Sequence, residues 1–428
     1  MRRTLLSRYS KLEQPPLNTI LDSTLVGEPV EGSNNWVDNQ LLAALQADLV
    51  DYLVTEDIGI HKKSRRLNID SRVLFLEDAV SIIRDFFDNT PPPPPSVENV
   101  YVYQINVDDP IFDSLRSDYD GFGNWFQKCK REQRKAYVIR EKASSNIAAI
   151  AIIKRENEVP NGPEGKVLKL CTFKVSKNYS GNRYGELLFK ALFDFMSCNE
   201  YECTYFTVFS KHEKLIDFAK DFGFIASGNK KATNEIILHK NFKYSTSEVE
   251  KLSPLDFNIA YGPMVTSFAI NSSFIIPIRP EFHATLFPEM ESQKHLFPSN
   301  RPCGNSIKKA YLSHSKTKQV EKGDNIIFYR SHDLKSITCI GIVEGSLRSK
   351  KPNEIARYVG KRTVYSYSEI QDLCSKPVLA IKFRLVKEIK PAITLRSLRA
   401  NGIINGQPQS ITKVKPESVK WLKQKIMM

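Results

Sequence analysis

The sequence predicts a multidomain protein that mixes helices and strands, in the α/β and α+β classes. Three observations lead to this prediction. The chain has 428 residues, which is too many for one ordinary hydrophobic core. Five consecutive prolines interrupt the chain at 91–95, and its basic residues concentrate beyond position 270. Hydrophobic residues make up 41% and charged residues 26%, a composition typical of folded domains.

The prolines mark the clearest boundary. A run of prolines builds neither a helix nor a strand ladder and forms a stiff extended spacer. We therefore expect a linker at 91–98 between an N-terminal segment, 1–90, and a central domain, 99–244. Serine-rich stretches then break the periodic pattern, which predicts a second linker at 245–273 and a C-terminal domain at 274–428.

The N-terminal segment has a helical pattern followed by two short strand-like runs. The helix is expected at 36–45, the strands at 50–55 and 72–76, and a further helix ends near Phe87. This order resembles the last half of a PIN nuclease domain. The resemblance implies that Asp38 and Asp57 are ligands of Mg²⁺ or Mn²⁺. The opening strand and aspartate of that family are missing here, so we expect no bound metal, and a metal-dependent nuclease remains a minor alternative.

The central region alternates strands and helices in a regular order. Predicted strands cover 100–105, 136–140, 147–154, 167–175, 205–209 and 234–239, and predicted helices cover 186–196 and 213–221. More helical material lies around Asp113, Trp125 and Phe126. The helix at 186–196 is amphipathic, because its apolar residues recur at helical spacing.

A glycine-containing turn, Ser180-Gly-Asn-Arg-Tyr-Gly185, lies between the strand at 167–175 and the helix at 186–196. The first N–H groups of a helix have no partner inside it and lie at the positive end of its dipole, so they attract phosphate. Small residues let the backbone come close to such a group, and Gly181 and Gly185 suit that task. The turn therefore predicts a pyrophosphate site.

This strand, turn and helix, with the later Phe222-Gly-Phe224, resemble the GNAT acetyltransferase family, whose turn reads Arg/Gln-x-x-Gly-x-Gly/Ala. Gly185 matches the last glycine, whereas Ser180 stands where Arg or Gln is usual and Arg183 where Gly is usual. The resemblance implies acetyl-CoA as the cofactor, and Arg183 adds charge for its phosphates. The implied cofactor-binding residues are Phe173, Val175, Ser180, Gly181, Asn182, Arg183, Tyr184 and Gly185.

Acetyl transfer needs a neutral amine and an acid that protonates the leaving thiolate. In many GNAT members this acid is a tyrosine, and the resemblance places it at Ala219 of this chain, five residues before Phe224. The acid must then come from elsewhere. The candidates are His212, Tyr184 and Cys171, and catalysis by positioning and backbone polarisation is a further alternative.

The C-terminal third carries short strands, expected at 275–278, 325–330, 337–344 and 378–385, with helices at Ala310 and Glu369. Such a pattern predicts a small β-barrel. The run from Lys322 to Arg330, followed by 339–344, resembles PUA-like barrels, including the ASCH and EVE groups. That resemblance implies binding of RNA or of a modified base.

The distribution of charge along the chain also favours a nucleic-acid partner. Residues 271–428 contain 28 Lys and Arg against 12 Asp and Glu, a net charge of +16, and the first 270 residues contain 34 against 36. A concentrated positive charge attracts phosphate-rich molecules. Aromatic rings stack on bases while cations hold phosphates, so mixtures of the two are typical of single-stranded nucleic-acid sites. The candidate residues are Tyr329, Arg330, Lys361, Arg362, Tyr365 and Gln409.

Together these features predict an acetyl-CoA-dependent N-acetyltransferase whose acceptor is an amine on a nucleic acid or nucleic-acid-bound molecule, for example a charged tRNA or an RNA base. The alternative is a nucleic-acid-binding protein with an inactive GNAT domain. RNA or tRNA is the expected partner, and a partner protein or antitoxin would fit by fold analogy alone. No apolar run is long enough to span a membrane, and we expect a cytoplasmic protein.

Overall fold

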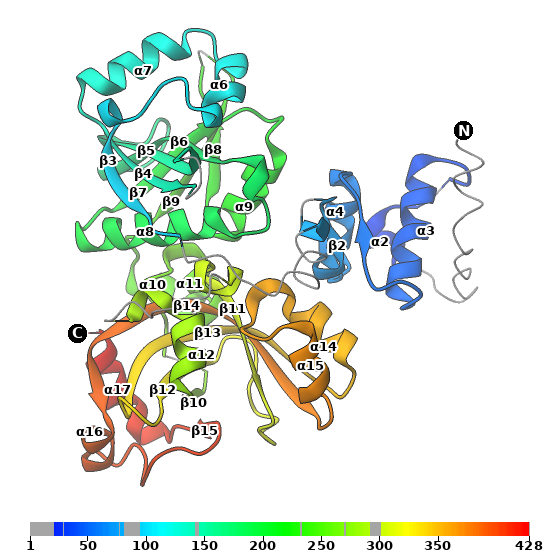
Figure 1. Cartoon of the computed structure of the whole chain (residues 1–428), viewed down its shortest axis with the longest axis vertical. Coiled ribbons are helices and arrows are strands. Elements are labelled where there is room, and N and C mark those ends of the chain that lie inside the picture. The colour runs from blue at the N-terminus through cyan, green and yellow to red at the C-terminus, as the bar shows by residue number, and fades with distance from the viewer. Residues whose placement is uncertain are drawn as a thin grey trace.

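A computed structural model describes residues 21–28, 30–76, 78–80, 95–141, 145–231, 233–268, 271–291 and 301–427. These residues form two units built on sheets and a smaller N-terminal segment beside them (Figure 1). The central unit and the C-terminal unit lie one above the other in this view.

The central unit is built on a seven-stranded sheet with the order β3-β4-β5-β6-β7-β9-β8. The strands are β3 (Glu98–Tyr101), β4 (Lys135–Arg140), β5 (Ile147–Glu158), β6 (Glu164–Val175), β7 (Cys203–Val208), β8 (Ile225–Asn229) and β9 (Ile236–Asn241). Neighbouring strands are antiparallel except β6 and β7, which are parallel. Helices α6 (Asp113–Asp118) and α7 (Phe122–Arg131) lie on one face, and α8 (Tyr184–Cys198) and α9 (Glu213–Asp221) lie on the other.

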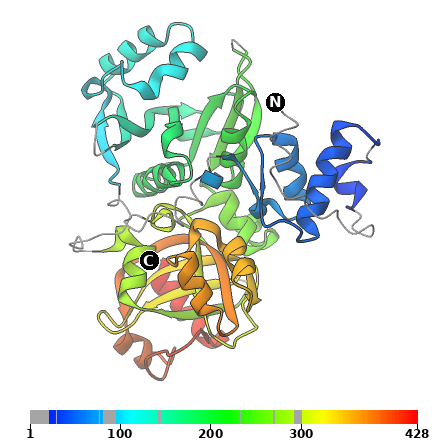
Figure 2. The same cartoon turned by 45° about the vertical axis from the view of Figure 1, so that its right-hand side comes forward.

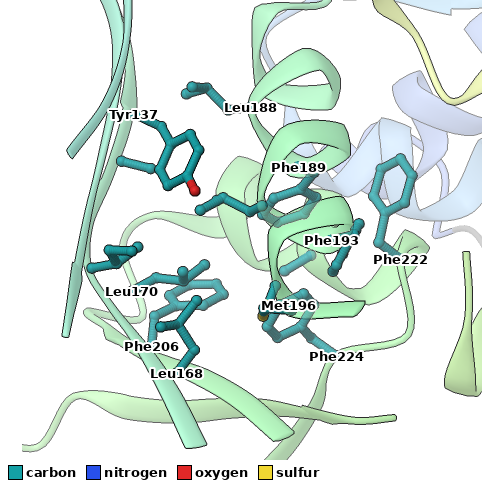
Figure 3. Packing of buried hydrophobic residues seen from close by; sticks show 14 of the residues in the cluster. Tyr137, Leu168, Leu170, Leu188, Phe189, Phe193, Met196, Phe206, Phe222 and Phe224 are labelled. Carbon is teal, nitrogen blue, oxygen red and sulfur yellow. The ribbon is translucent and has the colours of Figure 1, made fainter. Parts of the chain in front are cut away.

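Helix α8 packs against the sheet through a stripe of large apolar side chains. Phe189, Phe193 and Met196 recur at helical spacing and meet Leu168 and Phe206 of the strands (Figure 3). Burying a side chain of this size stabilises a fold by roughly 1.5–3 kcal/mol. A separate apolar cluster under α7 covers the opposite face, so both faces of the sheet are buried.

These bounds confirm most of the predicted central elements. Helix α9 covers 213–221 as predicted, and α8 extends the predicted helix at 186–196 by two residues at each end. The expected strand at 100–105 is shorter, because β3 ends at Tyr101 and 102–104 form a 3-10 turn. Strand β8 was not predicted. It is an edge strand whose residues are mostly exposed, so it lacks the alternating pattern of a half-buried strand.

The C-terminal unit is built on a six-stranded sheet with the order β11-β14-β13-β12-β10-β15. The strands are β10 (Ser273–Ile278), β11 (Lys308–Ser313), β12 (Asn325–Arg330), β13 (Ser336–Ser349), β14 (Val378–Thr394) and β15 (Thr412–Lys413). Its helices are α12 (Pro280–Leu286), α13 (Pro302–Asn305), α14 (Pro352–Val359), α15 (Tyr367–Leu373), α16 (Leu395–Ala400) and α17 (Pro416–Met427). Helix α15 contains Glu369, as predicted.

Two expectations for this unit need correction. The sheet is open, since no pairing joins β11 to β15 among the described residues, and the predicted closed barrel is therefore not observed. The helix expected at Ala310 is wrong. Ala310 lies in strand β11, where it and Leu312 alternate with their neighbours and pack under α14 and α15, a two-residue period that a strand produces.

Two helices occupy part of the expected linker at 245–273. These are α10 (Thr246–Lys251) and α11 (Pro254–Tyr261). The buried Lys240 of β9 donates hydrogen bonds to the carbonyl oxygens of Ile259 and Ala260, both at 2.8 Å. Helix α11 also contacts β13, so it connects the two sheets.

The N-terminal segment contains α2 (Ser23–Val26), α3 (Asn34–Gln46), β1 (Leu53–Val54), α4 (Ile58–Arg66) and β2 (Val73–Leu74), with β1 and β2 parallel. Helix α3 confirms the helix predicted at 36–45. The segment lies beside α9 and near α14 (Figure 2). The expected helix toward Phe87 and most of the proline run lie outside the described residues. Within the described part of the chain, every helix is too short or too polar to cross a bilayer.

Candidate active site

Strands β6 and β7 separate along their length. They pair only from Val167 to Lys169 on β6 and from Cys203 to Tyr205 on β7, although β6 continues to Val175 and β7 to Val208. Beyond Lys169 the described part of β6 therefore has a backbone edge with no β7 partner. The two carboxyl ends form an opening through the sheet.

A cavity of about 840 Å³ passes through this opening. On the side of α8 and α9 it is lined by Phe173, Val175, Tyr179, Phe218 and most of the turn before α8, namely Ser180, Gly181 and 183–186. On the side of α6 and α7 it is lined by Asp118, Tyr119, Trp125, Lys128, Arg134, Lys154, Glu156 and Lys169. The cavity thus joins the predicted phosphate turn to the opposite face of the sheet.

The turn before α8 has an unusual backbone. Gly181 has a φ of +79° and Arg183 a φ of +60°, both in the left-handed region. A residue with a Cβ atom costs roughly 1–2 kcal/mol there, which explains why glycine suits the position that Arg183 occupies. Such strain concentrates at functional sites. Here the two left-handed residues reverse the direction of the chain directly before α8, where the first N–H groups of the helix have no partner within it.

Gly185 lies in the first turn of α8, against α9. A Cβ atom at this position would come within 3.3 Å of Cζ of Phe218. The absence of a side chain leaves the backbone of the turn open to the cavity that Gly185 lines. Tyr184 is buried and its ring stacks on Tyr179, with 5.5 Å between ring centroids.

Glu186 ties the turn before α8 to the C-terminal unit. Its buried carboxylate accepts hydrogen bonds from the backbone N–H groups of Ile307, at 2.8 Å, and Lys308, at 3.1 Å. Burial opposes the charged form, but Arg362, Arg183 and the Lys308 N–H lower the pKa of Glu186 to about 2. The Asn305 amide also donates to the carbonyl of Asn182 at 2.9 Å. The C-terminal unit therefore braces the turn before α8.

Arg183 lines the cavity at the turn, and its Nε has no hydrogen-bond partner. Burial lowers the pKa of Arg183, and the nearby Arg362 lowers it further, while Glu186 and Asp78 act in the opposite direction. A guanidinium in this setting favours an anion, which would supply the missing acceptor. This is consistent with the phosphate role predicted for Arg183.

The three predicted catalytic candidates all line the cavity but differ in surroundings. Nε2 of His212, before α9, lies 3.4 Å from Oδ2 of Asp118. The thiol of Cys171 accepts a hydrogen bond from Arg134 at 3.3 Å, yet burial raises the pKa of Cys171, so the thiol stays neutral near pH 7. The expected acid position, Ala219, is fully buried in the core beside α8.

Sequence reasoning missed two carboxylates that line this cavity, Glu156 and Glu235, and the tyrosines that donate to them, of which Tyr119 also lines the cavity. Tyr119 donates a hydrogen bond to Glu235 at 3.4 Å, and Tyr205 donates one to Glu156. Tyr119 and Glu235 are 116 positions apart, so no local pattern connects them. The predicted strand at 234–239 contained Glu235 but gave no sign of its tyrosine partner; in the structure β9 begins one residue later, at Ile236.

The acidic residues of the N-terminal segment have other partners. Asp38 pairs with Lys63 at 3.0 Å, and Asp57 accepts from the N–H groups of Gly59 and Ile60 as the cap of α4. The described residues contain no group of three His, Cys, Asp or Glu side chains that could hold a metal. Phe75 and Asp78 of this segment instead line the cavity near α9.

The six residues predicted to bind nucleic acid do not all reach the surface. Tyr329 is wholly buried, and the buried Arg330 is paired with the largely buried Glu291 and the exposed Asp333, so neither presents a free side chain to a base or phosphate. This corrects the prediction. Strand β12 is buried on both faces, and composition alone cannot distinguish a buried aromatic–cation pair from an exposed one.

The other four differ in exposure. Arg362 is 19% exposed and is engaged with Glu186 and the carbonyl of Lys308, and Tyr365 packs on Phe282 at 5.1 Å. Lys361, which precedes Arg362 in the chain, is partly exposed. Gln409 is exposed near the start of β15. Their roles in binding stay predictions.

Residues 99–224 match the family model for the acetyltransferase (GNAT) family. This stretch is a GNAT acetyltransferase domain. The matched residues contain β6, the turn and α8, so the GNAT domain includes the opening and the phosphate turn described above. The family match supports the prediction that the protein is an N-acetyltransferase. The PIN-like and PUA-like assignments stay predictions.

Solved structures match parts of the chain, whereas no curated protein does. ASCH from Zymomonas mobilis is 16% identical and covers 36% of this chain and 94% of its own, with a TM-score of 0.28. A GNAT acetyltransferase from Staphylococcus aureus is 13% identical and covers 35% of this chain and all (100%) of its own, with a TM-score of 0.27. Ard1 from Thermoplasma volcanium is 10% identical and covers 35% and 99%, with a TM-score of 0.28.

Proposed function

We propose that the protein transfers an acetyl group from acetyl-CoA to an amine carried by a nucleic acid or nucleic-acid-bound molecule, such as a charged tRNA or an RNA base. The observation that carries the proposal is the cavity through the opening between β6 and β7, inside the GNAT domain. The cavity offers the cofactor one face of the sheet and the acceptor the other.

The residues on the α8 side fit acetyl-CoA. The backbone of the turn at 181–185 and the Arg183 side chain would hold the pyrophosphate. The edge of β6 from Leu170 to Val175 has no β7 partner among the described residues, so its N–H and C=O groups suit the amides of the pantetheine arm. When bound, acetyl-CoA supplies an activated acetyl thioester.

Charge supports an acceptor rich in phosphate. Lys128, Lys154, Lys169 and Lys230 line the cavity, and each lies within 4.0 Å of a carboxylate, with which a bound phosphate would compete. Trp125 lies beside Lys128 along the same wall and offers a ring for a base to stack on. The net charge of +16 in residues 271–428 would hold the remainder of such a molecule.

The cofactor assignment is tested by Gly185→Glu. The new carboxylate would occupy the phosphate turn and repel phosphate, so we expect the Kd for acetyl-CoA to rise at least about 100-fold in titration calorimetry. Gly406→Glu is the matched control, because a Cβ atom at Gly406 meets nothing within 4 Å. Equal affinity in both variants would remove the cofactor assignment.

The acceptor is tested with labelled acetyl-CoA. The full chain is incubated separately with aminoacylated tRNA, with deacylated total RNA and with cell protein. We expect label on one of the two RNA pools, and mass spectrometry of the product then identifies the acetylated amine. Label on protein alone would contradict a nucleic-acid-bound acceptor, and label on none would favour a binding protein.

A further inference from the structure

The Tyr119–Glu235 pair lies at the open end of the gap between β6 and β7. Glu235 directly precedes β9, and Ile236 at the start of β9 pairs with Val208, the last residue of β7. Tyr119 directly follows α6, and Lys174 near the end of β6 donates a hydrogen bond to Ser114 of that helix. The Tyr119 ring packs on Phe209, which directly follows β7. Both side chains therefore lie at the β7–β9 side of the opening, and both line the cavity.

The surroundings hold this pair in one arrangement. One oxygen of Glu235, Oε2, accepts a hydrogen bond from Thr233 at 2.7 Å and lies 3.6 Å from Nζ of Lys230. The other, Oε1, is the acceptor for Tyr119 at 3.4 Å. The Tyr119 ring packs on Phe209 with 5.1 Å between centroids. Glu235 is buried, with 4% of its surface exposed, so its carboxylate is kept from bulk water at one end of the cavity.

We propose that Tyr119 is the general acid of the transfer and that Glu235 is its general base. This inference rests on the proposed acetyl transfer. The amine nitrogen attacks the thioester carbon, a C–N bond forms, and Glu235 takes the proton that the nitrogen loses. The C–S bond then breaks, and Tyr119 gives its hydroxyl proton to the departing sulfur. Glu235 returns its proton to the phenolate across their hydrogen bond, which restores both groups.

The electrostatics of the pair suit this order. Burial, followed by the charge of Glu235, raises the pKa of Tyr119 to about 12, so the phenol keeps its proton until the amine reacts. Once Glu235 has accepted the amine proton, its negative charge is gone, and one reason for the high pKa disappears with it. Tyr119 becomes a better donor at the step that needs one. It thereby fills the role for which Ala219 has no functional group.

The test compares Tyr119→Phe with Tyr103→Phe in the full chain, with labelled acetyl-CoA and aminoacylated tRNA as probes. Tyr103 is 52% exposed and stacks on Tyr101 away from the cavity residues, so it is the matched control. We expect Tyr119→Phe to lower kcat by about 100-fold or more and to leave the Kd for acetyl-CoA within about twofold. Tyr103→Phe should match the wild type.

Two further variants separate chemistry from packing. Glu235→Gln keeps the shape of the side chain, and the double variant Tyr119→Phe/Glu235→Gln should be no slower than the slower single variant, because groups that act in one step are not additive. Placing 3-fluorotyrosine at position 119 keeps the hydroxyl and should restore most of the rate. Independent losses that multiply, or no recovery with 3-fluorotyrosine, would overturn the assignment even if Tyr119→Phe folds poorly.

The outcomes also separate this inference from the proposed function. A wild type that labels aminoacylated tRNA while Tyr119→Phe keeps more than about a third of its rate would overturn the acid–base assignment alone. A wild type that binds acetyl-CoA but labels neither tRNA, total RNA nor cell protein would overturn the proposed transfer, and the acid–base assignment with it.

Discussion

Arg362 Nη1 in the C-terminal unit lies 3.3 Å from Oε1 of Glu186 in the first turn of α8. Both side chains are largely buried, with 19% and 4% of their surfaces exposed. The helix that would hold the cofactor phosphates is thus anchored by a charge outside the GNAT domain. Together with the hydrogen bond from Asn305 to the carbonyl of Asn182, this contact makes the C-terminal unit part of the support of the site.

The first prediction concerns acid stability. Because the folded-state pKa of Glu186 is about 2 and its ordinary value is 4.5, its charge stabilises the fold above pH 4.5, and that contribution is lost as the pH falls toward 2. The lost free energy is about 3 kcal/mol. Glu186→Gln should therefore be less stable than the wild type at pH 7 and lose less stability on acidification.

Urea unfolding followed by tryptophan fluorescence at several pH values between neutral and acid would measure this difference. Glu250→Gln changes an exposed carboxylate in α10 and is the matched control. If Glu186→Gln loses stability with acid as steeply as Glu250→Gln does, the assignment of this charge is wrong.

The second prediction concerns the brace on the turn. Asn305→Ala removes the hydrogen bond to the carbonyl of Asn182 and loosens the turn before α8. We expect the Kd for acetyl-CoA to rise by about fivefold, which corresponds to the net free energy of one hydrogen bond. Asn401→Ala, which removes a bond within the exposed end of α16, serves as the control in the same titration. Equal Kd values in the two variants would show that the brace does not shape the site.

The third prediction concerns Cys171. Its thiol is neutral near pH 7, because burial raises its pKa, so it is a poor nucleophile. Cys171→Ala should keep kcat within about threefold of the wild type. Iodoacetamide should modify Cys198, which is exposed, well before Cys171. Peptide mass spectrometry over time would show the order, and early labelling of Cys171 would restore it as a catalytic candidate.

The fourth prediction concerns His212. If Tyr119 and Glu235 move the protons, the imidazole beside Asp118 is not needed for the chemical step. His212→Gln should lower kcat by less than about fivefold. A loss as large as that expected for Tyr119→Phe would instead assign the proton transfer to His212 and Asp118.

The fifth prediction concerns how the N-terminal segment docks on α9. Ion pairs join Lys62 to Glu213 at 2.7 Å and Lys214 to Glu56 at 2.7 Å, and all four side chains are at least 42% exposed. Exposed pairs are weak and screened by salt. Lys214→Glu should speed amide exchange in α4 by about threefold, and adding Glu56→Lys should reverse that change. If the rate of amide exchange in α4 does not change with either the charge substitutions or the salt concentration, apolar contacts hold the segment on α9.

Local features of this protein could be read from the sequence. The helix at 213–221, strand β6 and the glycine turn depend on hydrophobic periods and on backbone conformations that neighbouring residues decide. Gly181 indeed adopts a positive φ. The match to the GNAT family over 99–224 agrees with the domain that these features predict.

The tertiary structure alone decided which distant side chains meet. Glu186 and Arg362 are 176 positions apart, and Tyr119 and Glu235 are 116 apart. The pattern of residues along a sequence indicates whether a segment is a strand or a helix, but it does not identify the segment against which that element packs. For the same reason Tyr329 and Arg330 were predicted to bind nucleic acid, although β12 is covered on both faces. The sequence by itself determined most of the central elements and the left-handed backbone of the turn before α8. Packing decided the contact between Tyr119 and Glu235, the brace on α8 and which cations remain exposed.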